Sequence, residues 1–195
     1  TFEEAVVRTP EGIISVKGRA FIAASGGFEA NIEWLKKYWG NAADNFIIRG
    51  VKYNDGTILR VLIEKGALTV GNPKDMHATA VDARAPKYEG GIVTRIDVIP
   101  FGIVVNIHGK RFYDEGEDLW YRRYAIWGKL IAEQPNQIAF VIFDSKVSEL
   151  NQAFLPPSYP PILGNSLREL AQKIGLDSDT LEKTVSEFNS SVNCR

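Results

Sequence analysis

The sequence has a single cysteine, Cys194, next to its last residue, and only two histidines. No internal disulfide and no cysteine-based metal site can therefore form within the chain. A reducing compartment such as the cytoplasm fits this composition. With two histidines, a metal site built on several imidazoles has few ways to form. A Ser-His-Asp triad likewise has few possible histidines. We therefore expect no metal ion.

Excess charge and long apolar runs are also missing. The formal net charge is -1 and the isoelectric point is about 6.1, so no basic field is available to hold nucleic acid or an anionic membrane. No apolar run approaches the roughly 18 residues of a membrane span. The first residues, TFEEAVVR, lack both the apolar core of a signal peptide and a starting Met. We expect a chain that is part of a longer one, with no nucleic acid partner.

The 195 residues are 45% hydrophobic, which is typical of a globular protein. Apolar patterns predict two or three short strands over residues 4–23. AVVR and GIISV form a hairpin, and RAFIA follows it as a buried central strand. Asn31 can cap a helix over 32–39 that Gly40 ends, and Asp55 can cap a second helix that Gly66 ends. FIIRG between these two helices reads as a strand.

The pattern changes near residue 76, where we place a domain boundary. A long irregular stretch from Pro73 is followed by two β-rich runs, GIVTRIDVIP and FGIVVN. The pattern then predicts a helix over 119–134, the strand IAFVIFD, and a helix opened by the capping box Ser166-Leu-Arg-Glu169. A last amphipathic helix covers roughly 178–192. The fold class expected from the residues is α+β.

Few residues are candidates for chemistry. His77 lies in the irregular stretch at the domain boundary, where an imidazole can donate a hydrogen bond to an anionic substrate, although a structural role is equally compatible. His108 lies in a turn and reads as solvated. The segment GKRFYDEGEDLWYRR is rich in both charges, and most of them fit a salt-bridged surface. One arginine is enough to clamp a carboxylate with its planar fork. Arg122 and Arg123 point about 100° apart on a helix, so one can face the core side and the other water.

Five segments of the sequence occur in an order typical of one enzyme family. They are AFIAASGGFEAN, YNDGTILRVLIEKGA, DMHATAVD, GIVVNIHGKRFYDE and the arginine-led helix before IAFVIFD. Over nearly its whole length the chain resembles the FAD-dependent flavoproteins of the fumarate reductase and succinate dehydrogenase family. HATAVDARAPKYEGG, followed by RFYDEGEDLW and RRYAIWGKLIAEQ, is most similar to the tricarballylate dehydrogenase-like branch and the related flavoprotein of cobalamin precursor synthesis.

The resemblance implies the middle of such a protein. Residues 1–75 would be the distal part of an α/β FAD-binding domain, and residues 76–195 an α+β capping domain that binds substrate, truncated at its C-terminus. The glycine-rich loop that cradles the FAD pyrophosphate would lie before Thr1. On its own the chain is then expected neither to hold FAD firmly nor to turn over. The positions that match the family's flavin-facing segments are Ser25, Gly26, Gly27, Asn54, Asp55 and Gly56.

The resemblance also implies substrate contacts. His77 matches the substrate-binding histidine of the family's H-P-T motif, with Ala78 in place of the proline. Thr94 matches the threonine of the T-E-A-x-R-G segment, which holds a substrate carboxylate. Arg123 aligns with the arginine that acts as general acid or base. Arg122 is expected to bind substrate, and a slip of one residue in the alignment would make Arg122 the active arginine instead.

Two departures from the family pattern bear on the direction of the reaction. Arg95 and Val98 stand where the T-E-A-x-R-G segment has a glutamate and an arginine, which relay protons in fumarate reductases. An oxidising dehydrogenase is therefore favoured. The implied reaction moves a hydride between a small di- or tricarboxylic acid and FAD, and it needs a further electron acceptor that the sequence does not identify.

Two alternatives stay open at this point. One is a relative of fumarate reductase or ketosteroid dehydrogenase. The other is a non-enzymatic domain that holds a polycarboxylate with the basic cluster around Arg122 and Arg123.

Overall fold

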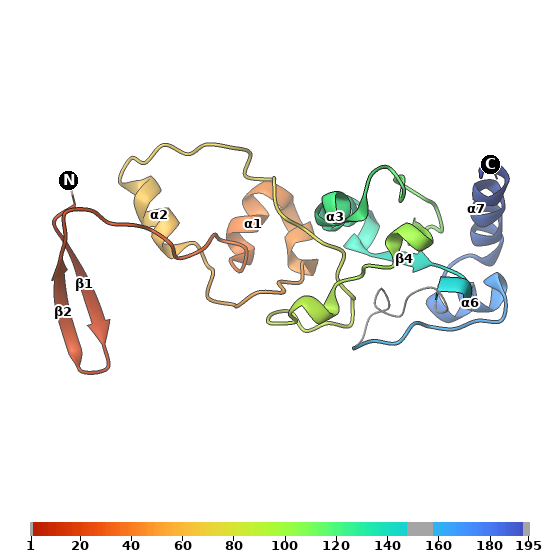
Figure 1. Cartoon of the computed structure of the whole chain (residues 1–195), viewed down its shortest axis with the longest axis horizontal. Helices are drawn as coiled ribbons and strands as arrows, with labels where there is room; N and C mark the ends of the chain where they lie inside the picture. The colour runs from red at the N-terminus through yellow and green to blue at the C-terminus, as the bar shows by residue number, and fades with distance from the viewer. Residues whose placement is uncertain (1, 148–157, 193–195) are drawn as a thin grey trace.

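The computed structural model describes residues 2–147 and 158–192, and the chain forms an elongated molecule (Figure 1). A β-hairpin lies at one end and the last helix, α7 (Ser178–Ser191), at the other. Helices and strands are mixed along the chain, as predicted. No helix in the described ranges has the length and apolar content that crossing a membrane requires.

The hairpin at the start consists of β1 (Glu4–Thr9) and β2 (Gly12–Lys17), paired antiparallel from Glu4↔Lys17 to Thr9↔Gly12. The structure confirms this part of the prediction. The predicted central strand RAFIA is wrong, because residues 19–23 have no regular structure and Ile22 is 87% exposed. A strand needs a neighbour for its backbone hydrogen bonds, and no described strand lies beside this segment.

Two short helices follow in the first third. The side chain of Asn31 accepts a hydrogen bond from the Trp34 N–H (3.0 Å), which caps α1 (Ile32–Trp39), and Gly40 ends that helix as predicted. A 3-10 helix, η1 (Gly40–Asn45), continues from it. The cap of α2 (Thr57–Glu64) lies one residue later than predicted: Gly56 is the N-cap, while the Asp55 carboxylate accepts from the Thr57 N–H (2.9 Å).

The predicted strand FIIRG is reduced to a single parallel bridge between Ile48 and Tyr88. The β-rich run GIVTRIDVIP is not a strand either, because it forms two 3-10 turns, η2 (Ile92–Thr94) and η3 (Ile99–Phe101). Pro100 in η3 has no N–H to give to a sheet. After the N-terminal hairpin, the next paired strand is β3 (Ile103–Asn106), which lies antiparallel to β4 (Ala139–Ile142).

The helix predicted over 119–134 is broken into three pieces, α3 (Trp120–Arg123), η4 (Tyr124–Ile126) and α4 (Trp127–Ala132), before η5 (Pro135–Gln137). Ala78 explains the break. Its N–H donates to the Ala125 carbonyl (2.9 Å), and its carbonyl accepts from the Gly128 N–H (2.8 Å). A backbone that passes this close interrupts the helical hydrogen-bond pattern.

The two-stranded sheet β3–β4 is covered on both faces. On one face, Ile103 and Val105 pack against α6 (Leu167–Ile174) and α7. On the other face, Val104 packs with Trp127 and Ile99. Because successive strand side chains point to opposite faces, burial on both sides explains the uninterrupted apolar run Ile103, Val104 and Val105.

Side-chain caps open the last two helices; the cap of α6 was predicted, and that of α7 was not. Ser166 accepts from the Glu169 N–H (3.1 Å) at the start of α6, and the Glu169 carboxylate returns to the Asn165 N–H (2.9 Å). Asp177 caps α7, whose Leu181 is fully buried.

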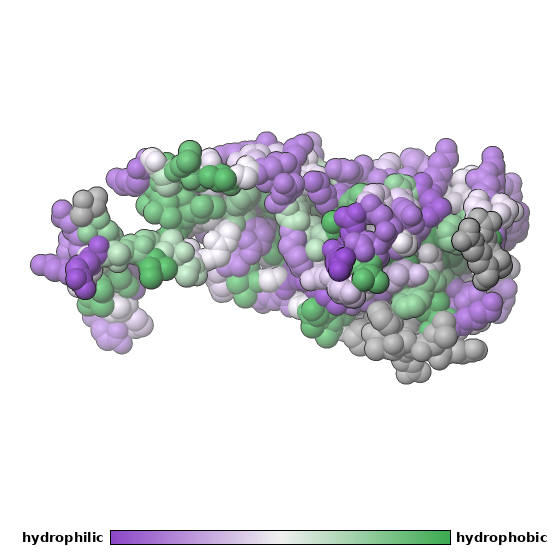
Figure 2. Space-filling model, turned by 45° about the horizontal axis from the view of Figure 1, so that its top comes forward, coloured by the Kyte–Doolittle hydropathy of each residue, from purple (hydrophilic) through white to green (hydrophobic). Residues whose placement is uncertain are grey.

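The N-terminal third has little core of its own. No residue of α2 is buried, and Leu68 and Val70, which follow it, are 89% and 90% exposed. Figure 2 shows hydrophobic residues gathered over α2 and the segment after it. The core of the described chain therefore lies mainly around β3 and β4.

Candidate active site

The two glycine-containing segments predicted to face the flavin meet in the structure. The Ala30 N–H donates to the Asn54 carbonyl (3.0 Å), and the Asn31 side-chain amide donates to the Asp55 carbonyl (2.9 Å). The Asn54 side chain donates to Glu29 Oε1 (2.6 Å). Residues more than twenty positions apart are thus fixed against each other by three hydrogen bonds. Ser25 lies in an exposed bend just before this junction.

Gly26 and Gly56 each occupy a backbone conformation that suits glycine. Gly26 has a φ of +83°, and a Cβ on it would lie 2.9 Å from Asn54 Oδ1. Gly56 has a φ of +77°, and a Cβ there would lie 2.6 Å from the Phe28 Cβ. Side chains with a Cβ are disfavoured at both positions by backbone strain and by contact. These glycines therefore permit the close approach of the two segments.

A cavity of about 760 Å³ opens beside this junction. Its size is within the range of small-molecule sites. Gly27 and Gly50 give it stretches of bare backbone, and Met76 and Ile131 give it apolar wall. The remaining lining comes from Leu35 and from residues in the ranges 27–29, 45–50, 73–83 and 128–138.

His77 lies on the wall of this cavity. Its Nε2 is 3.1 Å from the Tyr124 hydroxyl oxygen, and the two rings meet edge to face with centroids 5.3 Å apart. The adjacent Ala78 is fixed by its two backbone hydrogen bonds to residues 125 and 128. The structure therefore holds the imidazole in a defined orientation at the cavity, and its substrate-binding role stays a prediction.

A network behind His77 holds Arg95 in place. Its Nε donates to Asp97 Oδ2 (2.9 Å), and its guanidinium carbon lies 4.7 Å from the centroid of the Tyr124 ring. The Trp120 indole N–H donates to Asp97 Oδ1 (3.0 Å). Arg95 thus has an acid partner and an aromatic support.

Thr94 is 2% exposed, and its hydroxyl donates to the Gly91 carbonyl (2.9 Å). Its own carbonyl accepts from the Asp82 N–H (2.9 Å). Thr94 is not among the residues that line the cavity. Its matched role as a carboxylate ligand stays a prediction.

Arg122 and Arg123 differ in the way that their helical spacing predicts, since Arg122 is exposed and Arg123 is half-buried. Arg123 Nη2 lies 2.6 Å from Glu117 Oε1, and Arg123 Nε is buried without a partner among the described residues. The Tyr113 hydroxyl donates to the same carboxylate (2.6 Å), and this hydrogen bond raises the pKa of Tyr113. Neither arginine lines the cavity, so their roles at the substrate also stay predictions.

Arg49 is a cavity residue that the sequence reasoning missed. It lies on the cavity wall, and its Nη1 is buried without a hydrogen-bond partner among the described residues. Burial lowers the pKa of Arg49, and the nearby Arg95 guanidinium lowers this pKa further. The only sequence signal was a cation at the end of the apolar run FIIRG, directly before a glycine.

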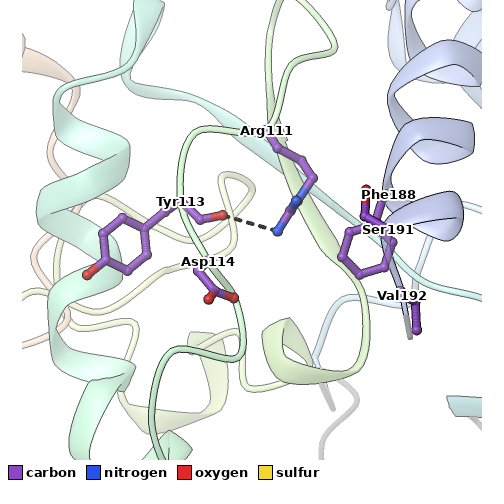
Figure 3. Close-up of a pocket in the computed structure, with 6 residues that line it drawn as sticks. All are labelled: Arg111, Tyr113, Asp114, Phe188, Ser191 and Val192. Atoms are coloured by element: carbon purple, nitrogen blue, oxygen red, sulfur yellow. Dashed lines mark hydrogen bonds between the residues drawn. The ribbon is translucent and has the colours of Figure 1, made fainter. Parts of the chain in front are cut away.

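A second hollow, of about 420 Å³, lies between the loop after β3 and α7 (Figure 3). Arg111 on its wall forms an ion pair with Glu115, donates to the Tyr113 carbonyl (3.4 Å) and lies over the Phe188 ring. The buried Glu115 in turn accepts from the Val104 N–H (2.6 Å). The Tyr113 ring points away from Arg111 in Figure 3. Arg111 and Glu115 already have partners within the chain. We therefore interpret this hollow as a structural feature and not as a ligand site.

No group of three or more His, Cys, Asp or Glu residues in the described ranges is close enough to hold a metal ion.

The cavity has a wall that contains glycines, and the segments around it occur in the order expected of a flavoprotein. Residues 2–193 match the family model described as FAD binding domain, so the chain belongs to the FAD binding domain family. The family match confirms the predicted flavoprotein class and FAD as the cofactor of that class.

Curated relatives are named as oxidoreductases and dehydrogenases, which confirms the enzyme class predicted for the family. The chain is 27% identical over 190 residues to an NADH:fumarate oxidoreductase of Klebsiella pneumoniae (strain 342), covering 96% of this chain and 19% of the relative. It is 29% identical over 182 residues to an NADH:acrylate oxidoreductase of Vibrio harveyi, covering 88% and 17%. It is also 29% identical over 193 residues to a 4-oxocyclohex-2-ene-1-carboxylate 5-dehydrogenase of Sinomonas cyclohexanicum, covering 86% and 31%.

Two solved structures share the fold. An open conformation of a flavocytochrome c3 fumarate reductase superposes with a TM-score of 0.63 at 22% identity, over 97% of this chain and 32% of that one. A 3-ketosteroid-Δ4-(5α)-dehydrogenase from Rhodococcus jostii RHA1 gives a TM-score of 0.63 at 21% identity, over 96% and 36%. The chain thus spans less than a third of the length of its curated relatives.

The cavity wall leaves room for a flavin, but of the residues predicted to face the flavin only Gly27 lines the cavity. The flavin-binding roles of Ser25, Gly26, Asn54, Asp55 and Gly56 therefore stay predictions. Gly27 and Gly50 present backbone to the cavity, and a Cβ at Gly50 would meet nothing within 4 Å. A flat ring can approach such a wall closely. Added side chains would fill this space.

Proposed function

We propose that this chain contributes the substrate side of a FAD-dependent dehydrogenase that oxidises a small di- or tricarboxylic acid of the tricarballylate type. The observation that carries the proposal is the cavity where glycine backbone, His77 and Arg49 meet, in a chain of the FAD binding domain family. Residues 1–75 would belong to the FAD-binding domain and residues 76–195 to the capping domain. When bound, FAD supplies the hydride chemistry of the reaction.

The chain's own residues have distinct parts in this proposal. Ser25, Gly26, Gly27, Asn54, Asp55 and Gly56 would hold the flavin edge through backbone and short side chains. His77, oriented by Tyr124, would donate a hydrogen bond to a substrate carboxylate, with Thr94 and Arg122 as further carboxylate ligands. Arg123 would pass one of its own protons to Glu117, 2.6 Å from its Nη2, and would then take the proton next to a substrate carboxylate. Glu117, bonded to both Arg123 and Tyr113, would position it.

The structure around residues 95–98 supports the oxidising direction. Arg95 is held by Asp97 and covers the Tyr124 ring, and Val98 is 1% exposed in the core. Val98 has no group that can carry a proton, and the Arg95 guanidinium is already paired with Asp97. A relay of the fumarate reductase type is therefore not supported here.

Two of the similar proteins correspond to alternative functions, fumarate reduction and ketosteroid dehydrogenation. A reductase of fumarate would run the same chemistry in reverse, and a ketosteroid dehydrogenase would take a large uncharged substrate. Arg49 and His77 on the cavity wall favour an anionic substrate over a steroid. A non-enzymatic domain would instead bind a polycarboxylate without flavin.

The protein expressed from its complete gene tests the proposal. Under anaerobic conditions, tricarballylate or succinate should bleach the flavin absorption, whereas a 3-ketosteroid should not. Bleaching by the steroid alone, or by none of these acids, would overturn the proposal.

The Arg123→Lys variant tests the assignment of the base. It should reduce turnover by two orders of magnitude or more, because a shifted or missing proton acceptor typically costs 10²–10⁴-fold. Arg8→Gln on the exposed hairpin is the matched control. Near-normal turnover of Arg123→Lys would reject Arg123 as the base.

A further inference from the structure

The backbone around Arg49 is fixed from both sides. The Ile48 N–H donates to the Lys87 carbonyl (2.8 Å), the Gly91 N–H to the Arg49 carbonyl (3.1 Å) and the Glu89 N–H to the Gly50 carbonyl (3.0 Å). Ile48 is buried. These bonds tie the stretch 48–50 to the segment that leads into Thr94 and Arg95. The Arg49 side chain thus starts from a rigid position on the cavity wall.

The charges around Arg49 do not balance. Burial and the Arg95 guanidinium lower the pKa of Arg49, whereas Tyr124 and Asp97 act to raise it. Asp97 already accepts hydrogen bonds from Arg95 and Trp120. Two guanidinium groups therefore share one carboxylate. Among the described residues, Arg49 itself forms no ion pair.

The two acids on the cavity wall do not neutralise Arg49. Glu29 accepts from the Asn54 side chain (2.6 Å), and Asp75 pairs with Lys129 (3.2 Å). A buried donor without a partner costs stability. An arginine that keeps such a donor at a cavity is therefore suited to receive an anion there.

We propose that Arg49 binds a carboxylate of the substrate at the cavity that His77 also lines, and so selects di- and tricarboxylic acids over monocarboxylic or uncharged compounds. The inference rests on the proposed function. A planar guanidinium fork can form two parallel hydrogen bonds with a carboxylate. Met76 and Ile131 provide the apolar wall for the carbon chain. Arg49 and His77 would then hold different carboxylates of one molecule.

The test measures binding in the protein expressed from its complete gene, by titration calorimetry with tricarballylate, succinate and butyrate. Arg49→Gln should weaken tricarballylate binding about 10- to 100-fold, the range expected for a lost charge-assisted hydrogen bond, and change butyrate binding by about twofold at most. Arg49→Lys should keep part of the affinity, because it keeps the charge but loses the fork. Arg8→Gln, on the exposed hairpin, is the matched control and should bind as the wild type does.

The outcomes separate the two proposals. If wild-type protein binds none of the three acids, the proposed function fails and this inference fails with it. If wild-type protein binds tricarballylate and Arg49→Gln binds it equally, only the inference fails. If Arg49→Gln instead lowers the flavin content at unchanged near-ultraviolet circular dichroism, Arg49 contacts the flavin and the inference is overturned.

Discussion

Gly56 lies where the turn before α2 meets the aromatic residues Phe28 and Trp34, whose rings stack with centroids 4.5 Å apart. Gly56→Ala should destabilise the chain by about 3 kcal/mol, because left-handed backbone strain of roughly 1–2 kcal/mol adds to overpacking of roughly 1–3 kcal/mol. The free energy of unfolding in urea is the measurement.

Gly66→Ala is the matched control for Gly56. Gly66 also has a positive φ, +90°, but a Cβ there would meet nothing within 4 Å. Its substitution should cost only the strain, about 1 kcal/mol. Equal costs at the two positions would show that the contact with Phe28 and Trp34 is unimportant.

The ionisation of Asp82 should make the free energy of unfolding depend on pH. Burial acts to raise the pKa of Asp82, but hydrogen bonds from the Arg84 side chain and backbone outweigh it, and the net pKa is lowered. A carboxyl with a lowered folded-state pKa stabilises the fold above its unfolded pKa of roughly 3.9, and this stabilisation is lost as pH falls through the folded value. Asp82→Asn should therefore cost stability at about pH 7 and cost progressively less towards about pH 3.

Urea unfolding of the wild type and Asp82→Asn at the two pH values checks this. Other carboxyls with a lowered pKa, such as Asp177, are present in both proteins and cancel in the difference. The same loss at both pH values would mean that the charge of Asp82 does not contribute.

At the scale of single residues, sequence reasoning was useful where a local pattern carried the information. The difference in exposure between Arg122 and Arg123 follows from helical spacing alone, whereas the role of His77 stays a prediction. Arg49 was missed because its position depends on contacts with residues 87–91 and 95–97. Such contacts leave no local signature in the sequence.

Among the elements, α1 depends on its N-cap. Asn31 accepts from the Trp34 N–H and also donates to the Asp55 carbonyl. Asn31→Ala should cost about 1–2 kcal/mol, since removal of a cap typically costs about 1 kcal/mol and the second hydrogen bond adds a comparable amount. Urea unfolding measures this cost.

Asn31→Ser separates the two contributions. A serine can keep the cap, but it lacks the amide that reaches Asp55, so its cost should be about half that of alanine. If serine and alanine are equally destabilising, the cap itself contributes little to stability.

Elements with local start and stop signals were predictable, and those that depend on neighbours were not. Asn31, Ser166 and Asp177 cap three helices near their expected starts, because capping involves residues two or three apart. RAFIA and GIVTRIDVIP have strand-like composition but no ladder to join in the described structure, and β-propensity depends strongly on context. The helix over 119–134 was broken by Ala78, a residue distant in sequence.

Over the whole molecule, burial is distributed unevenly. Within the part of the chain that the structure describes, both clusters of buried apolar residues lie beyond residue 79, around β3 and β4. The hairpin at the start exposes Val6 (70%) and Ile13 (68%), and no residue of α2 is buried. Local opening costs least where few apolar contacts must be broken. The chain should therefore open first at its N-terminal hairpin and α2, and last at β3–β4.

Hydrogen exchange followed by mass spectrometry tests this order on the 195-residue chain. Amides of β3, β4 and the middle of α7 should exchange most slowly, and those of the hairpin and α2 most rapidly. Val105→Ala should speed exchange throughout the β3–β4 region, because deleting buried methyl groups costs roughly 1–3 kcal/mol, whereas Val6→Ala should leave that region unchanged. If the hairpin amides exchanged as slowly as those of β3, the order would be contradicted. The hairpin would then be protected by contacts other than those of the two buried clusters.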